Sequence, residues 1–193
     1  MSVREKGFTL IELLVVIALI SILVSLAGPS YQVFIVDSRI SGSVNAAQGL
    51  LSYARSEAVK AQDTVTVCGS EDSATCSGTA SWSNGWLVFV DRDADRTIDG
   101  DDQLLKVADA QQGGNTLRLT GINLATGVIQ FNSRGELQGA AATAGTAILC
   151  PADNNTLDAR GVVVYLSGFT RLAVDEDNDG VVNDHAGNDV TCP

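Results

Sequence analysis

The feature that most constrains this chain is an apolar run close to its N-terminus. Residues 8–28 are FTLIELLVVIALISILVSLAG, and Glu12 is their only ionisable side chain. With a rise of about 1.5 Å per residue, a helix of this length crosses a hydrocarbon core of about 30 Å. We therefore expect residues 8–28 to form a membrane-spanning helix.

The leader before this run, residues 1–7, is short and basic. Its two basic residues outnumber its one acidic residue. This bias keeps the N-terminal end on the cytoplasmic side and directs the rest of the chain outward. Two cleavage sites are compatible with such a leader. A cut at the Ala27-Gly28 pair would discard the helix, whereas a cut after Gly7 would leave it on the mature protein.

Glu12 bears on the choice between these sites. A carboxylate within an apolar span is costly unless it finds a partner. A cut after Gly7 would free the amino group of Phe8, and Glu12 lies one helical turn away or faces the new terminus of a neighbouring subunit. Either pairing offsets two charges that the membrane disfavours.

The stretch Gly7-Phe8-Thr9-Leu10-Ile11-Glu12, between a basic leader and a long apolar helix, resembles the signature of type IV pilins and pseudopilins. The resemblance implies that a prepilin peptidase cleaves after Gly7 and methylates the amino group of Phe8. It also implies that Glu12 recruits the subunit to the growing filament. The alternative is an ordinary signal anchor that matches this signature by chance.

The four cysteines all lie beyond the apolar run, at Cys68, Cys76, Cys150 and Cys192. An exported domain meets an oxidising compartment, so an even number of cysteines favours disulfides, here two. Three pairings are possible. We favour Cys68 with Cys76, which bracket a short polar loop, and Cys150 with Cys192, which would hold the C-terminus. The alternative is a zinc site, but the cysteines are not closely paired and the only histidine, His185, lies apart.

Residues 29–62 continue the helical pattern with a different character. Apolar and mostly small residues recur at steps of four and three; they are Ile40, Val44, Ala47, Leu51, Ala54, Ala58 and Ala61. Such a stripe favours a helix that lies against a sheet and continues the membrane helix as the spine of the head. We expect Gly28-Pro29 to kink or loosen this helix. The alternative is two helices broken near Gly42.

Beyond residue 63 the hydrophobic period changes to two, which indicates strands. The candidate strands are 64–68, 86–91, 103–108, 116–120, 128–131, 146–150, 161–166 and 169–174. Ser167-Gly168 joins the last two in a tight hairpin. The sequence therefore predicts an α+β fold, with a long N-terminal membrane-spanning helix packed on an antiparallel β-sheet head.

Several parts of the head narrow the resemblance to the GspH/FimT family. They are the strand that follows Gly85, the Asp-rich turn before Gln103, the turn at 131–135 and the final hairpin. This family contains minor pilins of type IV pili and the minor pseudopilin of type II secretion. The paired cysteines and the loop after Cys68 favour the pilus branch, either FimU-like or FimT-like.

The first of two acidic clusters follows the strand at 86–91. It contains Asp91, Asp93, Asp95, Asp99, Asp101 and Asp102. The alternation of its first aspartates resembles the start of a calcium loop, in which oxygen ligands converge on one cation. However, Arg96 stands where the sharp turn of such a loop needs Gly. The alternative is a solvated loop in which Arg92 and Arg96 offset part of the repulsion.

The second cluster alternates in the same way and is followed by Gly180, which matches a calcium loop better; its acids are Asp175, Asp177 and Asp179. Ala186 stands where a bidentate Glu is expected, although Asp184 offers a substitute with different geometry. We therefore take this cluster as the candidate Ca²⁺ site, with a solvated acidic tail as the alternative. No other cofactor is expected, and His185 is interpreted as a surface residue beside acids.

No enzymatic activity is expected. The chain has one histidine, and no serine or cysteine has an apparent base beside it. The net charge of −11 argues against nucleic acid as a partner. Some FimT-like proteins take up DNA through a Gly-Arg-x-Arg motif in the last hairpin. Here that place is Gly168-Phe169-Thr170-Arg171, in which Phe169 replaces the first Arg.

The expected organisation is a prepilin leader at 1–7, a transmembrane half-helix at 8–28, an amphipathic half-helix at 29–62 and a β-rich head at 63–193. The resemblance implies a minor pilin of a type IV pilus, held single-pass in the bacterial inner membrane with its head in the periplasm. Its implied partners are the prepilin peptidase, other minor pilins, the major pilin and the assembly machinery.

In the filament at the cell surface, such a subunit would prime or cap assembly and serve adhesion or twitching motility. Two alternatives stay open. One is a minor pseudopilin of type II secretion, and the other is a DNA-uptake pilin that binds DNA with its head.

Overall fold

The computed structural model of the chain describes residues 7–121, 127–139 and 143–192, without the side chains of residues 26–30, 32 and 33. The chain divides into two compact units, Met1–Ser38 and Arg39–Pro193. Helix α1 (Leu10–Ala61) contributes to both units, and strands β1 to β8 all belong to the second. The first unit consists, over its described residues, of the start of α1 and the residues just before it.

Helix α1 continues through Gly28-Pro29 and through Gly42 as one element. The expected kink at Gly28-Pro29 does not interrupt it, and the alternative of two helices broken near Gly42 is wrong. The helix ends in a Schellman motif. Gln62 takes a left-handed φ of 58°, and the Asp63 amide donates to the Ala58 carbonyl at 3.3 Å. This arrangement satisfies a carbonyl that the helix end would otherwise leave unpaired.

The predicted apolar stripe of α1 is buried in the second unit. Its buried members are Ile40, Val44, Ala47, Leu51, Ala54 and Ala58, and Leu50, which the predicted stripe did not include, is buried beside them. Ala61, the last position of the predicted stripe, is exposed because the helix ends there. Small side chains at this face bring the helix close to the strands, which is what the sequence pattern indicated.

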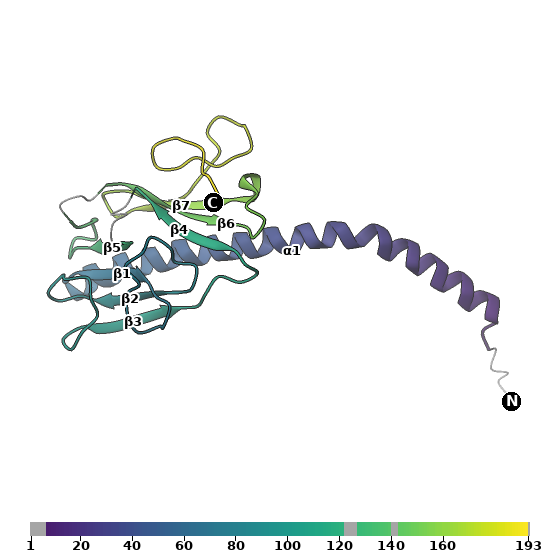
Figure 1. The fold of residues 1–193 in the computed structure, drawn as a ribbon, viewed down its shortest axis with the longest axis horizontal. Helices are drawn as coiled ribbons and strands as arrows, with labels where there is room; N and C mark the ends of the chain where they lie inside the picture. The colour runs from purple at the N-terminus through teal and green to yellow at the C-terminus, as the bar shows by residue number, and fades with distance from the viewer. Residues whose placement is uncertain (1–6, 122–126, 140–142, 193) are drawn as a thin grey trace, which may run out of the picture. The chain divides into compact units, whose positions relative to one another are not determined.

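Two antiparallel four-stranded sheets lie against α1 (Figure 1). The first has the order β3-β2-β1-β5 and consists of β1 (Val65–Gly69), β2 (Trp86–Val90), β3 (Gln103–Ala108) and β5 (Val128–Phe131). The second has the order β4-β6-β7-β8 and consists of β4 (Thr116–Thr120), β6 (Gly145–Cys150), β7 (Arg160–Val164) and β8 (Thr170–Leu172). The α+β fold class is therefore confirmed.

One face of each sheet packs on residues 39–61 of α1 in a shared hydrophobic core. The first sheet contributes Val65, Val67, Val88 and Ile129, and the second contributes Leu117, Leu119, Ala147 and Val162. Every second residue of a strand points into this core, because side chains alternate between the two faces of a strand.

The outer face of each sheet is covered by a loop. On the first sheet, Ile98 and Cys76 pack on a cluster formed by Cys68, Leu87, Phe89 and Val128. On the second, Val181, Val182 and Cys192 pack on Ile148, Cys150, Ala159 and Val190. These covering loops carry the two acidic clusters, so both clusters lie on the side of their sheet that faces away from α1.

The eight predicted strands are all present, with bounds that differ by a few residues. The largest difference is at the last hairpin, where β7 and β8 are shorter than predicted. The connection starts at Tyr165, whose amide donates to the Phe169 carbonyl at 2.9 Å. Gly168 closes the turn with a φ of 73°, a conformation that a side chain would strain.

Candidate functional site

The N-terminus of α1 is capped by reciprocal hydrogen bonds between Thr9 and Glu12. The amide and the hydroxyl of Thr9 both donate to Glu12 Oε2 at 2.9 Å, and the Glu12 amide donates to Thr9 Oγ1 at 3.3 Å. This is a capping box, which satisfies amides that a helix N-terminus leaves unpaired. This capping box was not among the features predicted above, although the Thr-x-x-Glu spacing in the sequence indicates it.

The segment around the predicted cleavage site is open to solvent. Phe8 is 91% exposed, Gly7 is also exposed, and a side chain built on Gly7 would meet nothing within 4 Å. Along the part of the chain that the structure describes, no helix has both the length and the apolar character needed to span a membrane. Cleavage after Gly7, methylation of Phe8 and the spanning role of residues 8–28 stay predictions.

The four cysteines form the two favoured disulfides. Cys68 pairs with Cys76, with 5.6 Å between their Cα atoms, and Cys150 pairs with Cys192 at 5.7 Å. All four cysteines are used in this way and none is free, so the zinc alternative is wrong. The first bond closes a loop at the end of β1, and the second joins the C-terminal segment to β6.

The first acidic cluster forms a loop over residues 91–102, directly after β2. Asp91, Asp93 and Asp102 each place one carboxylate oxygen within 4.8 Å of the other two, and Asp93, Asp95 and Asp99 form a second such group. Beside them lies a surface depression of about 430 Å³, lined by Arg92, Asp93, Asp99, Asp101 and Asp102. The tertiary structure thus brings Asp102 to the first aspartates.

Asp91 differs from the other acids of this loop because it is fully buried. Its Oδ2 accepts hydrogen bonds from Thr66 Oγ1 at 2.5 Å, from the Arg96 amide at 3.1 Å and from Gln130 Nε2 at 3.1 Å. Its Oδ1 is buried and has no hydrogen-bond partner in the described structure. Burial raises the pKa of Asp91, and the charge of Asp102 adds to that rise.

The second acidic cluster lies on the loop after β8, and its carboxylates are more exposed. Oxygens of Asp175, Asp177 and Asp179 lie within 4.8 Å of one another. Both oxygens of Asp175 are occupied, because Oδ1 accepts from the Asn178 amide at 2.7 Å and Oδ2 from the Gly180 amide at 2.9 Å. The Gly180 amide is the main cause of a lowered Asp175 pKa. The structure brings the three predicted ligands together, and Ca²⁺ binding by them stays a prediction.

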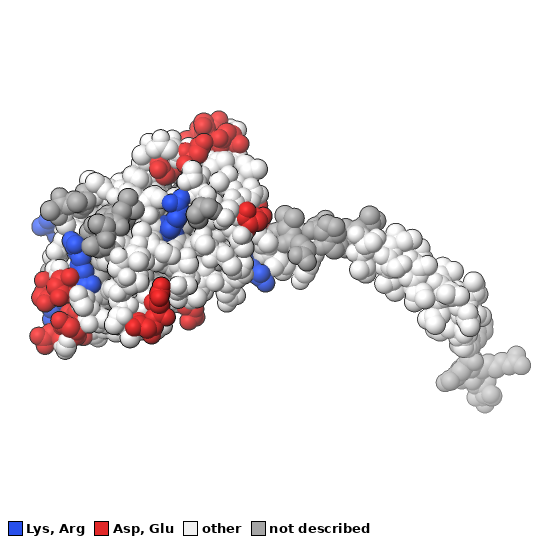
Figure 2. Space-filling model, in the orientation of Figure 1, with Lys and Arg blue, Asp and Glu red and all other residues white. Residues whose placement is uncertain are grey.

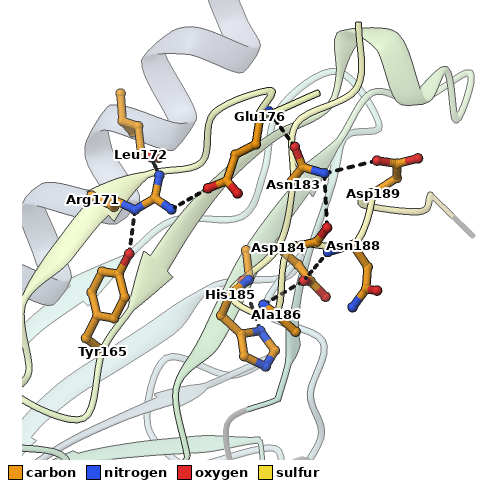
Figure 3. Close-up of polar contacts among 12 residues, drawn as sticks. Tyr165, Arg171, Leu172, Glu176, Asn183, Asp184, His185, Ala186, Asn188 and Asp189 are labelled. Carbon is orange, nitrogen blue, oxygen red and sulfur yellow. Dashed lines mark hydrogen bonds and ion pairs between the residues drawn. The ribbon is translucent and has the colours of Figure 1, made fainter. Parts of the chain in front are cut away.

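The segment that follows folds back through side-chain hydrogen bonds (Figure 3). Asn183 accepts from the Glu176 amide at 2.6 Å and donates to Asp189 Oδ1 at 3.1 Å. Asp184 accepts from two amides of its own turn, those of Ala186 and Asn188, and thus stabilises that turn.

The interpretation of His185 as a surface residue needs correction. Its amide donates to Thr146 Oγ1 at 2.8 Å, and its ring lies 3.3 Å from the same hydroxyl. His185 is therefore half-buried against β6. The sequence carried no signal for this contact, because residues 146 and 185 are far apart in the chain.

Arg171, the one arginine of the DNA-type hairpin pattern, is already paired. Its Nε donates to the Tyr165 hydroxyl at 2.6 Å and its Nη2 donates to Glu176 Oε1 at 3.1 Å (Figure 3). These contacts raise the Arg171 pKa, with the Tyr165 hydrogen bond as the largest cause. The guanidinium also lies 5.9 Å from the centre of the Tyr165 ring. A phosphate would have to compete with Glu176 for this side chain.

Acidic side chains gather in patches over the head, and basic ones are sparser on the face that Figure 2 shows. One acidic patch covers the loops that precede the C-terminus, which are yellow in Figure 1. This distribution agrees with the net charge of −11, and the described residues on the face in Figure 2 do not form the basic stripe that nucleic acid binding uses.

Two family models match the chain. One, described as the prokaryotic N-terminal methylation motif, matches residues 3–28. The other, described as type II transport protein GspH, matches residues 43–168, which is more than half of the chain. The chain belongs to the GspH family. It is thus a type IV pilin or pseudopilin, and proteins of this family and fold are structural rather than enzymatic.

Curated relatives match a shorter part of the chain. The fimbrial protein EcpC of Eikenella corrodens is 51% identical over 45 residues, which cover 23% of this chain and 29% of that protein. The type IV major pilin protein PilE1 of Neisseria gonorrhoeae is 43% identical over 49 residues, which cover 25% of this chain and 30% of that protein. The chain therefore spans about three tenths of the length of these relatives.

Two crystal structures of the type IV minor pilin FimU of Pseudomonas aeruginosa share the fold. The first has a TM-score of 0.56 and 20% identity and covers 71% of this chain and 90% of FimU. The second has a TM-score of 0.53 and 20% identity and covers 69% and 92%. The similarity establishes a common architecture of helix and sheets.

Proposed function

We propose that this chain is a minor pilin of a type IV pilus that primes or caps the filament. The observation that carries the proposal is the presence of the N-terminal methylation motif and a GspH-family head on one chain. The fold shared with the minor pilin FimU supports the pilus branch of the family. In this function the head makes contacts with other minor pilins and the major pilin at the base or tip of the filament.

Maturation takes place at Gly7. The prepilin peptidase cleaves after Gly7 and methylates the amino group of Phe8, and the exposure of both residues supports access by an enzyme. Mass spectrometry of the mature protein should give an N-terminal methylated Phe8. A mature chain that starts at Gly28 or later would contradict the filament function, because the helix would have been discarded as a secretion signal.

Before assembly, residues 8–28 hold the protein in the inner membrane with the head in the periplasm. A fusion of alkaline phosphatase to the C-terminus should therefore be active, since that enzyme needs an oxidising compartment. A full-length fusion that is present in the membrane fraction but has no phosphatase activity would contradict this orientation.

Glu12 pairs with the N-terminal amine of a neighbouring subunit as the chain leaves the bilayer. The capping box complicates the usual test, because Glu12→Ala removes both the charge and the cap. Glu12→Gln separates the two roles, since Gln caps a helix in the same way as Glu but carries no charge. We expect both variants to insert into the membrane and both to be absent from sheared pili.

Thr9→Ala is the matched control, because it weakens the cap and keeps the carboxylate. Near-normal incorporation of Thr9→Ala, together with loss in Glu12→Gln, would support the pairing. If Glu12→Gln assembles normally while Glu12→Ala does not, Glu12 acts through the helix cap and the charge pairing is wrong. Immunoblots of pilus and membrane fractions measure both outcomes.

The second candidate function is that of a minor pseudopilin in type II secretion, which the description of the matching family model favours. Gene deletion separates the two functions. Loss of twitching motility with normal exoprotein secretion supports the pilus function, whereas the reverse supports secretion. We do not propose DNA uptake, because Arg171 is engaged by Glu176. A gel shift with the purified protein at low salt should show no retardation.

A further inference from the structure

The loop 91–102 has an oxygen ligand at each ligand position of the twelve-residue loops that hold calcium between two helices. In those loops the ligands come from positions 1, 3, 5, 7, 9 and 12, and position 7 uses its backbone carbonyl. Counted from Asp91, these positions are Asp91, Asp93, Asp95, Thr97, Asp99 and Asp102. The last position holds Asp in place of the usual Glu, which is one methylene longer.

The geometry removes the objection that Arg96 occupies the glycine position. Arg96 has a φ of 73°, in the left-handed region that glycine usually supplies, and its amide donates to Asp91 Oδ2. In the second acidic loop, Gly180 has a φ of 97° and makes the equivalent hydrogen bond to Asp175. The backbone of loop 91–102 therefore makes the sharp turn without glycine.

The short side chain of Asp102, at position 12, can still bind the same cation as the other aspartates. One carboxylate oxygen each of Asp102, Asp91 and Asp93 already lies within 4.8 Å of the other two. Two oxygens bound to one Ca²⁺ at 2.3–2.6 Å can be separated by up to about twice that distance. The three carboxylates can therefore reach a common cation with little movement.

A separate observation points to a ligand at this place. Asp91 Oδ1 is fully buried and has no hydrogen-bond donor, while Oδ2 has three. A buried carboxylate oxygen without a partner is costly. Because Oδ2 is turned toward Thr66 and Gln130, Oδ1 is the oxygen that remains available to a cation beside Asp93 and Asp102.

The loop also carries an excess of negative charge. Six aspartates and two arginines lie within residues 91–102. Arg96 directs its Nε to Gln130 Oε1 at 2.9 Å. Among the described residues, no ion pair joins Arg92 or Arg96 to these aspartates. A divalent cation would offset this charge at the point where the carboxylates meet.

We propose that loop 91–102 binds one Ca²⁺ through Asp91 Oδ1, Asp93 and Asp102, with the remaining ligands from Asp95, Asp99 and the Thr97 carbonyl. All of these ligands are oxygens on a flexible loop, which suits Ca²⁺ better than Mg²⁺, since Mg²⁺ demands a tight octahedron and keeps its waters. The bound ion holds the loop, and Ile98 within it, against the outer face of the first sheet. This inference does not depend on the pilus function.

The second acidic loop does not share the decisive feature. Both oxygens of Asp175 already accept amides of the loop, and position 12 of that loop is Ala186. It therefore supplies a matched control on the same molecule, with the same spacing of its first three aspartates.

The experiment is calorimetric titration of CaCl₂, and separately MgCl₂, into the full chain purified in detergent and freed of metal with EDTA. We compare the wild type with Asp93→Asn/Asp102→Asn and with Asp177→Asn/Asp179→Asn. Each variant removes two negative charges. We expect one Ca²⁺ per chain, affinity weakened roughly tenfold or more by the first pair of substitutions and unchanged by the second.

Three results would overturn the proposal. They are no binding of Ca²⁺ at millimolar concentration, loss of binding only in Asp177→Asn/Asp179→Asn, and equal weakening in both variants, which would indicate general screening by acids. Circular dichroism checks that the variants fold. If Asp93→Asn/Asp102→Asn fails to fold, the single variant Asp93→Asn replaces it, because that side chain accepts only the Asp95 amide; unchanged affinity in this variant would also overturn the proposal.

Discussion

The two acidic loops of the head have the same alternation of aspartates but are anchored in different ways. Loop 91–102 begins at a buried carboxylate that contacts Thr66 and Gln130 on the neighbouring strands. The loop after β8 begins at Asp175, which is half-exposed and bonds only within its own turn. The shared spacing of aspartates thus gives both loops the same turn, but of these two residues only Asp91 has a buried oxygen without a hydrogen-bond partner in the described structure.

The two disulfides also differ in their relation to the acidic loops. The second acidic loop lies inside the segment that Cys150–Cys192 closes, whereas the first lies outside the segment that Cys68–Cys76 closes. The bonds span 42 and 8 residues. Longer closed loops gain more stability through the unfolded state. We expect Cys150→Ala/Cys192→Ala to cost about 4 kcal/mol and Cys68→Ala/Cys76→Ala about 2.5 kcal/mol. Thermal unfolding followed by circular dichroism measures both, and equal losses would contradict the loop-length argument.

Truncation of the first aspartate compares the loops directly. Asp91→Ala removes the acceptor of three donors, from Thr66, Arg96 and Gln130. Because each buried donor left without a partner costs about 1 kcal/mol or more, we expect a loss of about 3 kcal/mol. Asp175→Ala should cost clearly less, since its donors can turn to water. Urea unfolding of the two variants measures their free energies of unfolding. A larger loss of stability in Asp175→Ala than in Asp91→Ala would contradict the expectation.

A smaller effect on stability is expected at the sixth position of each loop, which is Arg96 in the first and Gly180 in the second. Gly180→Ala places a side chain at a φ of 97° and 3.2 Å from Leu157 Cδ2, and we expect it to cost about 1 kcal/mol. Arg96→Gly relieves the same strain but loses the hydrogen bond to Gln130, so its stability should change little. Its Ca²⁺ affinity should rise, because a positive charge is removed. Lower affinity in Arg96→Gly would count against the proposed site.

The smallest effect is expected at Asp72, in the loop closed by Cys68–Cys76. Backbone hydrogen bonds from Thr75 and Ala74, with the Thr75 amide as the main cause, lower its pKa. A lowered folded-state pKa stabilises the fold above the unfolded value of about 4, and this contribution is lost as the pH falls through the folded-state pKa. Asp72→Ala should therefore be less stable than the wild type at pH 7, with a smaller difference at pH 3. A difference that does not shrink on acidification would exclude the carboxylate as its source.

Local patterns in the sequence predicted most of the fold. The steps of four and three from Ile40 to Ala58 identified the buried face of α1, and patterns such as the alternation in Thr116–Thr120 identified the strands. These predictions succeeded because helix and strand periods are properties of neighbouring residues. The capping box at Thr9 and Glu12 was equally readable from the sequence.

The sequence by itself determined the N-terminal signature around Gly7 and Glu12, the long helix and the positions of the strands, because short-range chemistry controls each of them. Only the tertiary structure decided that Asp91 is buried beside Asp102, that Arg171 is held by Glu176 and that His185 rests on Thr146. Those relations depend on how strands and loops pack on one another. The same aspartate pattern therefore has one environment on the first sheet and another on the second.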